Sequence, residues 1–426
     1  MKKQQSETSR RSLLAGGALA AGAAGALGFA GVGAAWTAGR QEPASGESVH
    51  DSYPLFGEHQ PGIETPAQDR LHFVALTVKV KTKQELRGLF EDWTVAAERL
   101  MAGQEVGQER SYQSPPDDTG EAMDLSASHL TLTFGLGRSL FVNQDGTDRF
   151  GLKEQLPAAL TEIPKMSGDA LEEARSGGDL CIQACADDPQ VAVHAVRNLI
   201  RIAGGRAVVA WSQLGFGRTS STSTSQVTPR NLFGFKDGTS NVKAEDPGVL
   251  AQHVWTSADN SEGSPAWMEG GSYCAVRRIR MNIEMWDRAS LKEQEQVVGR
   301  TKKEGAPLSG GSEFTAPDFS MQGKYGPIIP SSSHVHLMHP EQNQGVQMLR
   351  RGYNYTDGTD GLGHLDAGLF FIAYICDPRT HFVPVLQKMM KSDAMSEYLR
   401  HTGSALFAVP PGVSGEDDFV ASGLFD

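Results

Sequence analysis

The segment DLCIQACADDP, residues 179–189, decides the fold, because its pattern returns in GLFFIAYICDP at residues 368–378. Each segment is a short, mostly apolar run that ends at an Asp-Pro step, which is typical of a buried β-strand bounded by a turn signal. A segment of helical periodicity follows each one, at residues 191–203 and from about residue 381. The recurrence predicts that the chain holds two similar units that arose by duplication.

Strand-like and helix-like patterns occur in the same order around both copies. Side chains alternate between apolar and polar in the strand-like segments, whereas apolar residues recur every three or four positions in the helix-like ones. The further strand-like segments are 71–80, 129–134, 206–213, 272–286 and 404–409, and the further helix-like ones are 82–101 and 291–298. We therefore predict an α+β fold of two units, each an antiparallel sheet covered by helices.

The N-terminus has the pattern of an export signal. Lys2 and Lys3 precede the twin arginines Arg10 and Arg11, and a stretch rich in Ala and Gly follows. This order predicts a twin-arginine signal peptide over residues 1–38; a single membrane anchor is the alternative, but Ala and Gly make a weak spanning helix. Because the twin-arginine route carries folded proteins, often with a cofactor inserted, we expect a periplasmic or extracellular protein that holds a cofactor.

Composition narrows the remaining possibilities. Residues 39–68 are polar and rich in Gly, Pro and Glu, which predicts a linker or an irregular surface arm. The formal net charge of −12 disfavours binding to nucleic acid. The four cysteines, Cys181, Cys185, Cys274 and Cys376, are too few for a disulfide-dense secreted scaffold, and they show no zinc-ligand spacing. We expect them to be buried free thiols.

The loop-like stretch NLFGFKDGTSN, residues 231–241, places one carboxylate between two glycines and two phenylalanines. Its simplest interpretation is an Asp-Gly turn, which is a common hairpin signal. The alternative is that Asp237 is an acid or base held in an apolar loop, with Lys236 beside it incidental. The loop alone favours the turn, so a catalytic role for Asp237 depends on evidence from the rest of the chain.

Histidines gather in SHVHLMHP, residues 333–340. If this segment is a strand, His334 and His336 share a face, and an HxH metal site becomes a fair hypothesis. A structural histidine is the commoner alternative for any one of them, His339 included. Arg350 follows in an alternating run, where an ion pair or a solvated strand end is the ordinary interpretation.

An aspartate, a histidine and an arginine together supply the parts for peroxide chemistry at a haem. A neutral imidazole can bind haem iron axially. A carboxylate can move a proton between the two peroxide oxygens, and a guanidinium can stabilise the charge that develops as their bond breaks. Spacing alone does not choose haem over zinc.

Three motifs in order give the chain a family resemblance. TPRNLFGFKDGTSN at residues 228–241 contains a GxxDG signature, SHVHLMHP follows, and LRRGYNY at 349–355 leads to GHLDAGLFFIAYICDP at 363–378. Over roughly residues 71–426 the chain resembles the dye-decolourising peroxidases. With its leader it is most similar to the exported subgroup that includes the peroxidase component of bacterial ferrous-iron uptake systems.

The resemblance implies a fold and a cofactor. The two units would be ferredoxin-like domains of the dimeric α+β barrel type, over residues 69–228 and 229–426. One haem b per chain would bind without a covalent bond, mainly in the second domain. Hydrogen peroxide would be the oxidant, and dyes, phenolics or other bulky donors would be oxidised by one-electron steps.

The resemblance also implies residue roles. Asp237 would be the distal acid and base, Arg350 the distal arginine and His334 the proximal iron ligand. The haem-edge contacts would be Gly238, Thr239, Ser240 and His339. The family often has Asn at the position of His339 and Arg at that of His336, so the contacts of His339 are the least secure.

Two further residues follow from chemistry. A ligand histidine normally donates its second N–H to an acceptor, and we select Asp366 for that role. Electrons from donors too large for the pocket could pass through a surface aromatic residue such as Tyr353. A carboxylate base also predicts an acid pH optimum, because aspartate has a reference pKa of about 3.9.

Three functions remain open from the sequence. The first is the haem peroxidase. The second uses the same pocket to release iron from haem, with components of an iron-uptake system as partners. The third, of another class, is a non-catalytic metal-binding protein that uses His334, His336 and His339. A homo-oligomer is compatible with each.

Overall fold

The structure, a computed structural model, describes residues 51–107 and 111–425. The predicted signal peptide and the first part of the predicted linker therefore lie outside the described residues. None of the helices in these two ranges combines the length and the apolar character needed to cross a membrane.

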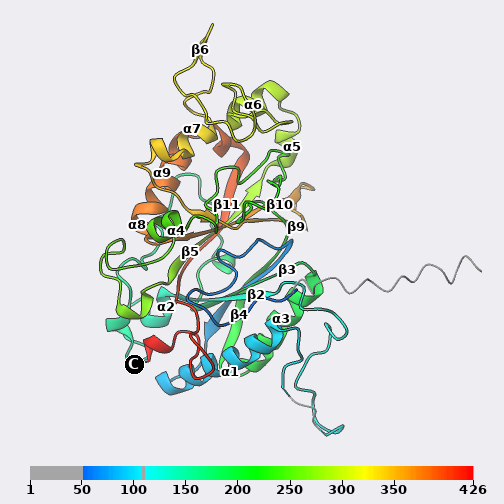
Figure 1. The fold of residues 1–426 in the computed structure, drawn as a ribbon, viewed down its shortest axis with the longest axis vertical. Helices are drawn as coiled ribbons and strands as arrows, with labels where there is room; N and C mark the ends of the chain where they lie inside the picture. Colours follow the sequence, from blue (N-terminus) through cyan, green and yellow to red (C-terminus); the bar gives the residue numbers. More distant parts are fainter. Residues whose placement is uncertain (1–50, 108–110, 426) are drawn as a thin grey trace, which may run out of the picture. The chain divides into compact units, whose positions relative to one another are not determined.

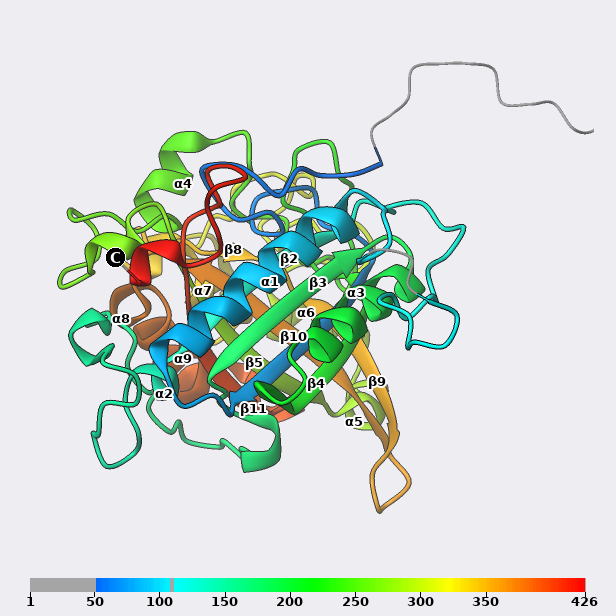
Figure 2. The same ribbon diagram turned by 90° about the horizontal axis from the view of Figure 1, so that it is seen from below.

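The first half has the element order βαββαβ of a ferredoxin-like unit. Its bounds are β1 Arg70–Val78, α1 Lys83–Met101, β2 Thr131–Gly137, β3 Leu180–Ala186, α3 Pro189–Ile202 and β4 Ala207–Arg218, with a short α2 at Arg138–Phe141. The strands pair antiparallel in the order β2-β3-β1-β4. Helices α1 and α3 cover one face of this sheet (Figures 1 and 2).

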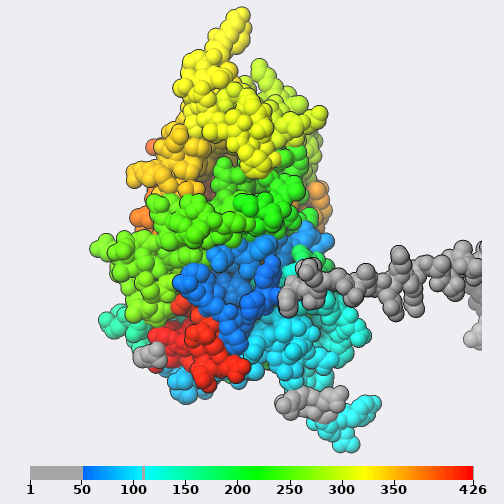
Figure 3. All heavy atoms as spheres, viewed as in Figure 1, coloured from blue at the N-terminus to red at the C-terminus, as the bar shows by residue number. Residues whose placement is uncertain are grey.

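The second half repeats this order with insertions. Its strands are β5 Ser272–Met281, β8 Leu349–Arg350, β9 Tyr353–Thr359, β10 Leu365–Ile375 and β11 Leu399–Val409, with a small hairpin of β6 Gln322–Gly323 and β7 Gly326–Pro327. Its helices are α4 Pro247–His253, α5 Ile283–Trp286, α6 Leu291–Val298, α7 His334–Met338, α8 Pro378–His381 and α9 Val383–Ser392, followed by the 3₁₀ helix η5 Ala394–Tyr398. The strand order β9-β10-β5-β11 corresponds, strand by strand, to the order β2-β3-β1-β4 of the first half. The segment around β6 projects from this end of the molecule (Figure 3).

The two Asp-Pro steps that indicated the repeat each begin a helix, in the same way in both halves. Asp188 caps the first turn of α3 by accepting from the backbone N–H of Gln190, and Asp377 caps α8 by accepting from that of Arg379. Proline then occupies the first helical position, where its missing N–H costs nothing. The repeat in sequence is thus a repeated strand-to-helix junction.

The two half-sheets close into one barrel along two short seams. β2 pairs with β11 through Leu136↔Ala408 and Gly137↔Phe407, and β4 pairs with β9 through Phe216↔Asn354 and Arg218↔Tyr353. The long β5–β10 pairing within the second half completes the ring. This closed antiparallel sheet with helices outside confirms the predicted α+β fold of the dimeric barrel type.

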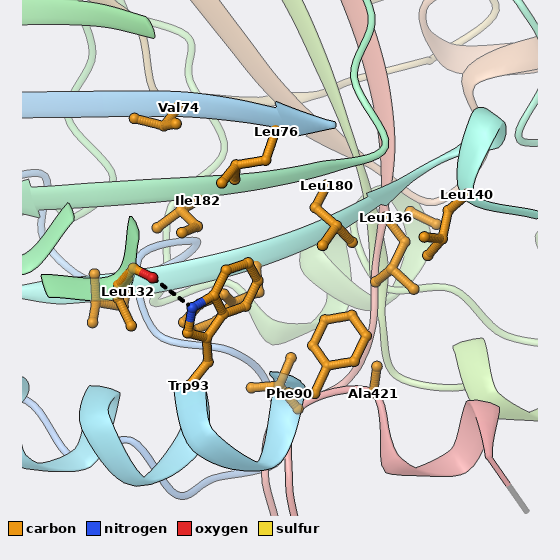
Figure 4. Packing of buried hydrophobic residues seen from close by; sticks show 14 of the residues in the cluster. Val74, Leu76, Phe90, Trp93, Leu132, Leu136, Leu140, Leu180, Ile182 and Ala421 are labelled. Carbon is orange, nitrogen blue, oxygen red and sulfur yellow. Dashed lines mark hydrogen bonds between the residues drawn. The ribbon is translucent and has the colours of Figure 1, made fainter. Parts of the chain in front are cut away.

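Side chains separate into an inner and an outer core according to the strand period of two. On β1, Phe73 faces the barrel interior, where it contacts Phe370 and Phe407 of the second half. Its neighbours Val74 and Leu76 face the helices, against Phe90 and Trp93 of α1 (Figure 4). Both halves thus contribute to one interior.

The interior also holds groups whose placement the sequence left open. The four cysteines are buried and free, as expected. Tyr353 is fully buried, so the expectation that it lies at the surface is wrong: it points inward from β9 because it alternates with outward-facing positions. It packs beside the fully buried Arg351.

The described part of the predicted linker is not a free surface arm. Gln60 is buried and donates to the carbonyls of Phe134 and Pro410, at 3.1 and 3.0 Å. The Arg351 guanidinium donates to the carbonyls of Ile63 and Thr65, at 3.3 and 2.5 Å. The segment is irregular, as expected, but several of its polar groups form buried hydrogen bonds instead of facing solvent.

Candidate functional site

One cavity of about 250 Å³ lies in the second half, and most of the predicted site residues line it. Its floor is the outward face of the sheet, including Arg277 and Ile279 of β5 and Phe371 of β10. In the first half the equivalent face is covered by α1 and α3, with Trp93 packed against the strands. The residues that line the cavity and carry the predicted roles are Asp237, Gly238, Thr239, Ser240, His334, His339 and Arg350.

The Asp237 loop is a turn, as its simplest interpretation required. Asn231 N–H donates to the Phe235 carbonyl at 3.1 Å, and Asp237 N–H donates to that of Pro229 at 3.0 Å. Gly238 has φ +85°, and a Cβ there would lie 2.8 Å from Ser220 Cα, so only glycine fits. The turn therefore fixes the backbone on both sides of the carboxylate.

Both oxygens of the Asp237 carboxylate accept a hydrogen bond. Arg350 Nη1 donates to Oδ1 at 3.0 Å, and Asn231 Nδ2 donates to Oδ2 at 3.1 Å. The side chains are partly exposed, 18% for Asp237 and 27% for Arg350, so the pair borders open space instead of being sealed in the core.

Asn241 holds the backbone of Arg350 as a neighbouring strand would. Its Oδ1 accepts from Arg350 N–H at 2.8 Å, and its Nδ2 donates to the Arg350 carbonyl at 2.9 Å. Sequence reasoning missed the roles of Asn231 and Asn241, although they are the first and last residues of NLFGFKDGTSN. The only signal was their position at the two ends of the turn.

Lys236 is not incidental. It forms an ion pair with Glu313, and Glu313 also accepts from Thr239 Oγ1 at 3.2 Å. Burial opposes the charge of Glu313, but the Lys236 ammonium and the hydroxyl donors outweigh burial and lower the pKa of that carboxyl. The contact ties the turn to the segment that carries the projecting hairpin.

His334 lies on α7 and not on a strand, so the predicted HxH face is wrong. Leu337 N–H donates to the Ser333 carbonyl at 3.1 Å, which makes this segment one helical turn. Residues two positions apart on a helix do not share a face. His336 instead contacts Phe319 edge to face, with ring centroids 4.7 Å apart.

The described residues contain no group of three or more metal-ligating side chains of the His, Cys, Asp and Glu types. His339 caps the short 3₁₀ turn after α7, where its Nδ1 accepts from Glu341 N–H at 3.4 Å. Burial lowers the pKa of His339. The three histidines of SHVHLMHP therefore do not form the metal site of the third hypothesis.

The partner of His334 is Asp393. His334 Nδ1 lies 2.7 Å from Asp393 Oδ2, whose side chain is fully buried between α9 and η5. Burial alone would lower the pKa of His334, but the Asp393 carboxylate outweighs that effect and raises it. This bond occupies Nδ1 and leaves Nε2 available to bind a metal.

The choice of Asp366 as that partner is wrong. Asp366 accepts from Arg278 Nη2 at 2.8 Å, beside Asp357, which accepts from the same nitrogen at 2.9 Å. Arg278 is almost fully buried, and these two carboxylates offset the cost of burying its charge. Asp393 has no local sequence signal that links it to His334, because the two residues are far apart in the chain.

The cavity fits a haem. The buried Arg277 uses Nη1 for Asp169, at 3.0 Å, while its Nε and Nη2 have no hydrogen-bond partner in the described structure. Such unpaired donors suit the propionate carboxylates of a haem. The apolar wall that would contact the macrocycle comes from Phe233, Phe235, Ile279, Leu369, Phe371 and Leu386. His334 Nε2 supplies the axial ligand type.

Comparisons with known proteins agree with this geometry. The family description "Dyp-type peroxidase, N-terminal" matches residues 60–217, and "Dyp-type peroxidase, C-terminal" matches residues 228–414. The chain is 36% identical over 426 residues to a deferrochelatase of Escherichia coli strain 536, covering 98% of this chain and 97% of the relative.

Solved structures agree as well. A DyP-type peroxidase from Streptomyces coelicolor superposes with a TM-score of 0.79 at 41% identity, over 88% of this chain and 97% of the other. Ferric DtpA from Streptomyces lividans gives the same TM-score and identity, over 88% and 96%.

Proposed function

The chain belongs to the DyP-type peroxidase family, and from that premise we propose the roles of the residues that line its cavity. The protein is a haem peroxidase, which reduces hydrogen peroxide and oxidises an electron donor. Haem is held without a covalent bond. The observation that carries the proposal is that the Asp237–Arg350 pair lines the same cavity as His334, whose Nδ1 is bonded to the buried Asp393.

His334 would bind the haem iron through Nε2, and Arg277 would bind a propionate. The bound haem supplies an iron that reacts with peroxide and then withdraws electrons from donors one at a time. His334 keeps its ring orientation because Nδ1–H donates to the buried Asp393.

Asp237 moves the proton. Its carboxylate would accept a proton from one peroxide oxygen and return it to the other, which would leave as water. Arg350 stabilises the negative charge that develops while the oxygens separate. Asn231 holds the second carboxylate oxygen, so that the proton leaves and returns at a fixed position.

Two substitutions separate these roles. We expect His334→Ala to lose haem, because the iron ligand is removed, whereas Arg350→Leu retains haem and reacts with peroxide about 100-fold more slowly, in the range found for loss of one stabilising group. The Soret band of the purified protein measures haem content, and stopped-flow absorbance measures the reaction with peroxide.

Matched controls come from the same elements. His336→Ala, on the same helix, and Arg400→Leu, on an exposed position of β11, should keep both haem and rate. Full haem content in His334→Ala, or an unchanged peroxide rate in Arg350→Leu, contradicts the assignments.

A second candidate is the release of iron from haem, which the 36% identity to a deferrochelatase favours. The same His334 would hold the iron before its release. Incubating the haem-loaded protein with a ferrous chelator distinguishes the two functions: a metal-free porphyrin product supports iron release, and an intact haem supports the peroxidase alone.

We also propose that the protein works outside the cytoplasm, with an iron-uptake system as partner and as a homo-oligomer. The twin arginines at residues 10–11 support export. The name of the relative supports the link to iron. The donor would be a dye, a phenolic compound or another bulky molecule.

A further inference from the structure

His401 is a buried histidine in the cavity, and the proposed peroxide chemistry does not use it. It is 1% exposed, it lines the cavity, and neither of its ring nitrogens has a hydrogen-bond partner within residues 51–107 and 111–425. Buried polar groups are normally paired, because an unpaired one has given up its hydrogen bonds to water without replacing them. The ring is therefore placed to contact a group that enters the cavity.

His401 and Arg277 are neighbours on adjacent strands. In the pairing of β11 with β5, His401 lies opposite Ile279, and Arg277 is two positions further along β5. Residues in this diagonal relation share one face of a sheet. Arg277 is also 1% exposed, and its Nε and Nη2 are unpaired in the described part of the chain. The two side chains thus form one corner of the cavity with four unpaired nitrogens.

The charge of Arg277 is already balanced in this corner. Its Nη1 donates to Asp169 Oδ1 at 3.0 Å, and both side chains are buried, at 1% and 0% exposure. A buried guanidinium and a buried carboxylate at this distance cancel each other's charge. Any further anion that binds to Arg277 therefore adds a negative charge that the pair does not offset.

His401 is uncharged at neutral pH unless an anion lies beside it. Burial and Arg277 lower the pKa of His401 to about 4, although Asp169 acts in the opposite direction. The neighbouring segment that packs against β11 carries Arg175, whose charge pairs with Glu172 at 3.1 Å. The cavity residues contributed by β10, α9 and η5 are all uncharged. Arg277 and Asp169 are thus the charged groups that act on the ring.

We propose that His401 binds the same haem propionate as Arg277 and takes up a proton as the haem enters. The inference rests on the haem site proposed above. A propionate carboxylate adds one negative charge to a corner in which Arg277 and Asp169 already cancel. A protonated His401 makes the corner neutral again, and its ring N–H donates to the carboxylate.

Haem retention should then depend on pH. Because one proton is bound together with each haem, the bound state is favoured as the pH falls from 8 towards 6, by at most tenfold for each pH unit. The direction follows from His401, which is neutral before the propionate arrives and charged afterwards. Loss of haem must return the same proton to solvent.

Transfer of haem to an acceptor tests this coupling without any turnover. The holoprotein is mixed with an excess of apomyoglobin, and the change in the Soret band gives the rate of haem loss. His401→Gln keeps an N–H donor but cannot take up a proton. The ratio of the loss rate at pH 8 to that at pH 6 should therefore be roughly tenfold larger in the wild type than in His401→Gln.

Two features of this comparison isolate His401. Protonation of His334 favours haem loss in acid, but it does so in both proteins and cancels in the comparison. His364→Gln, at an exposed position, is the control and should show the same ratio as the wild type.

A second readout counts the proton directly. When haem leaves in weakly buffered solution at pH 7, an indicator dye should record about one proton more per haem from the wild type than from His401→Gln. The proton changes of apomyoglobin are the same in both experiments and cancel. Asp169→Asn removes one negative charge from the corner, so it should retain haem and also lack the additional proton.

The outcomes separate two failures. Equal proton release and an equal pH dependence in the wild type and His401→Gln overturn proton uptake at His401 while the haem site stands. If His401→Gln retains no haem, the proton count of Asp169→Asn decides, and a count equal to that of the wild type overturns the proposal. A wild-type protein that binds no haem at either pH overturns the proposed function itself.

Discussion

We expect Asp393 to determine how much electron density His334 donates to the haem iron. Its buried carboxylate accepts from Nδ1, so the imidazole is more basic than one bonded to a neutral acceptor. We expect Asp393→Asn to raise the reduction potential of the bound haem. A neutral amide is a weaker hydrogen-bond acceptor than a carboxylate, so the imidazole becomes less basic. A spectroelectrochemical titration measures this shift.

Asp366→Asn is the matched control for that measurement. Asp366 binds Arg278 in a separate ion-pair network, so its substitution should leave the potential unchanged. A shift of the same size in both variants, or none in Asp393→Asn, contradicts the role of Asp393.

At the scale of residues, the sequence predicted which side chains meet in the cavity but not what holds them. Asp237, His334 and Arg350 stand in recognisable motifs. Their partners Asn231, Asn241 and Asp393 are ordinary polar residues, whose contacts depend on how distant segments fold together. Asp366 lies in one of these motifs, yet its carboxylate binds the buried Arg278.

Among the elements, the segment that precedes β1 is anchored in part by one buried arginine. Arg351 is fully buried, and its guanidinium binds the carbonyls of Ile63 and Thr65 and the side chain of Gln68. We expect Arg351→Met to destabilise the protein by about 3 kcal/mol, because buried carbonyls lose their donor. Calorimetry measures the loss, and limited proteolysis should show earlier cleavage within residues 51–68.

The exposed Arg400 provides the comparison for this prediction. Arg400→Met removes the same charge without uncovering a buried group, so it should change the unfolding temperature little. Equal effects of the two substitutions count against the anchoring role of Arg351.

Element types were predicted well where a period was long enough to read. The 291–298 helix and the strands of the repeat follow from apolar spacing. The single turn of α7 is too short to establish a helical period, so the sequence of SHVHLMHP does not exclude the strand on which the HxH face depends. The segment 39–68 has no period at all, and its composition could not reveal that Gln60 and the backbone near Thr65 are buried.

Acidification should lower the free energy of unfolding of the whole molecule. His381 is buried against His253, with Nε2 and Nδ1 3.0 Å apart, and burial, together with His253, lowers the pKa of His381 to about 4. In the unfolded chain a histidine has a pKa of about 6.5. Between these values the unfolded state binds more protons, so the unfolding free energy falls as the pH drops from 7 towards 4.

The size of this effect can be checked. His381 alone should contribute on the order of 2 kcal/mol of lost stability at pH 5. The difference in unfolding temperature between pH 7.5 and pH 5 should be smaller in His381→Gln than in the wild type. His364→Gln, at an exposed position, should show the same difference as the wild type. An identical pH dependence in His381→Gln contradicts the prediction. The acid optimum predicted from the sequence would lie in the pH range in which stability falls.

The cavity residues extend from Thr219 to His401, and β11, which begins at Leu399, pairs with both β5 and β2 to complete the ring. A ribosome releases the N-terminal half first, and that half can form its helix-covered sheet early. The floor of the cavity is complete only when the last strand has been made. We therefore expect haem to be loaded only after β11 has been synthesised, because a chain that stops before residue 399 lacks part of the cavity lining.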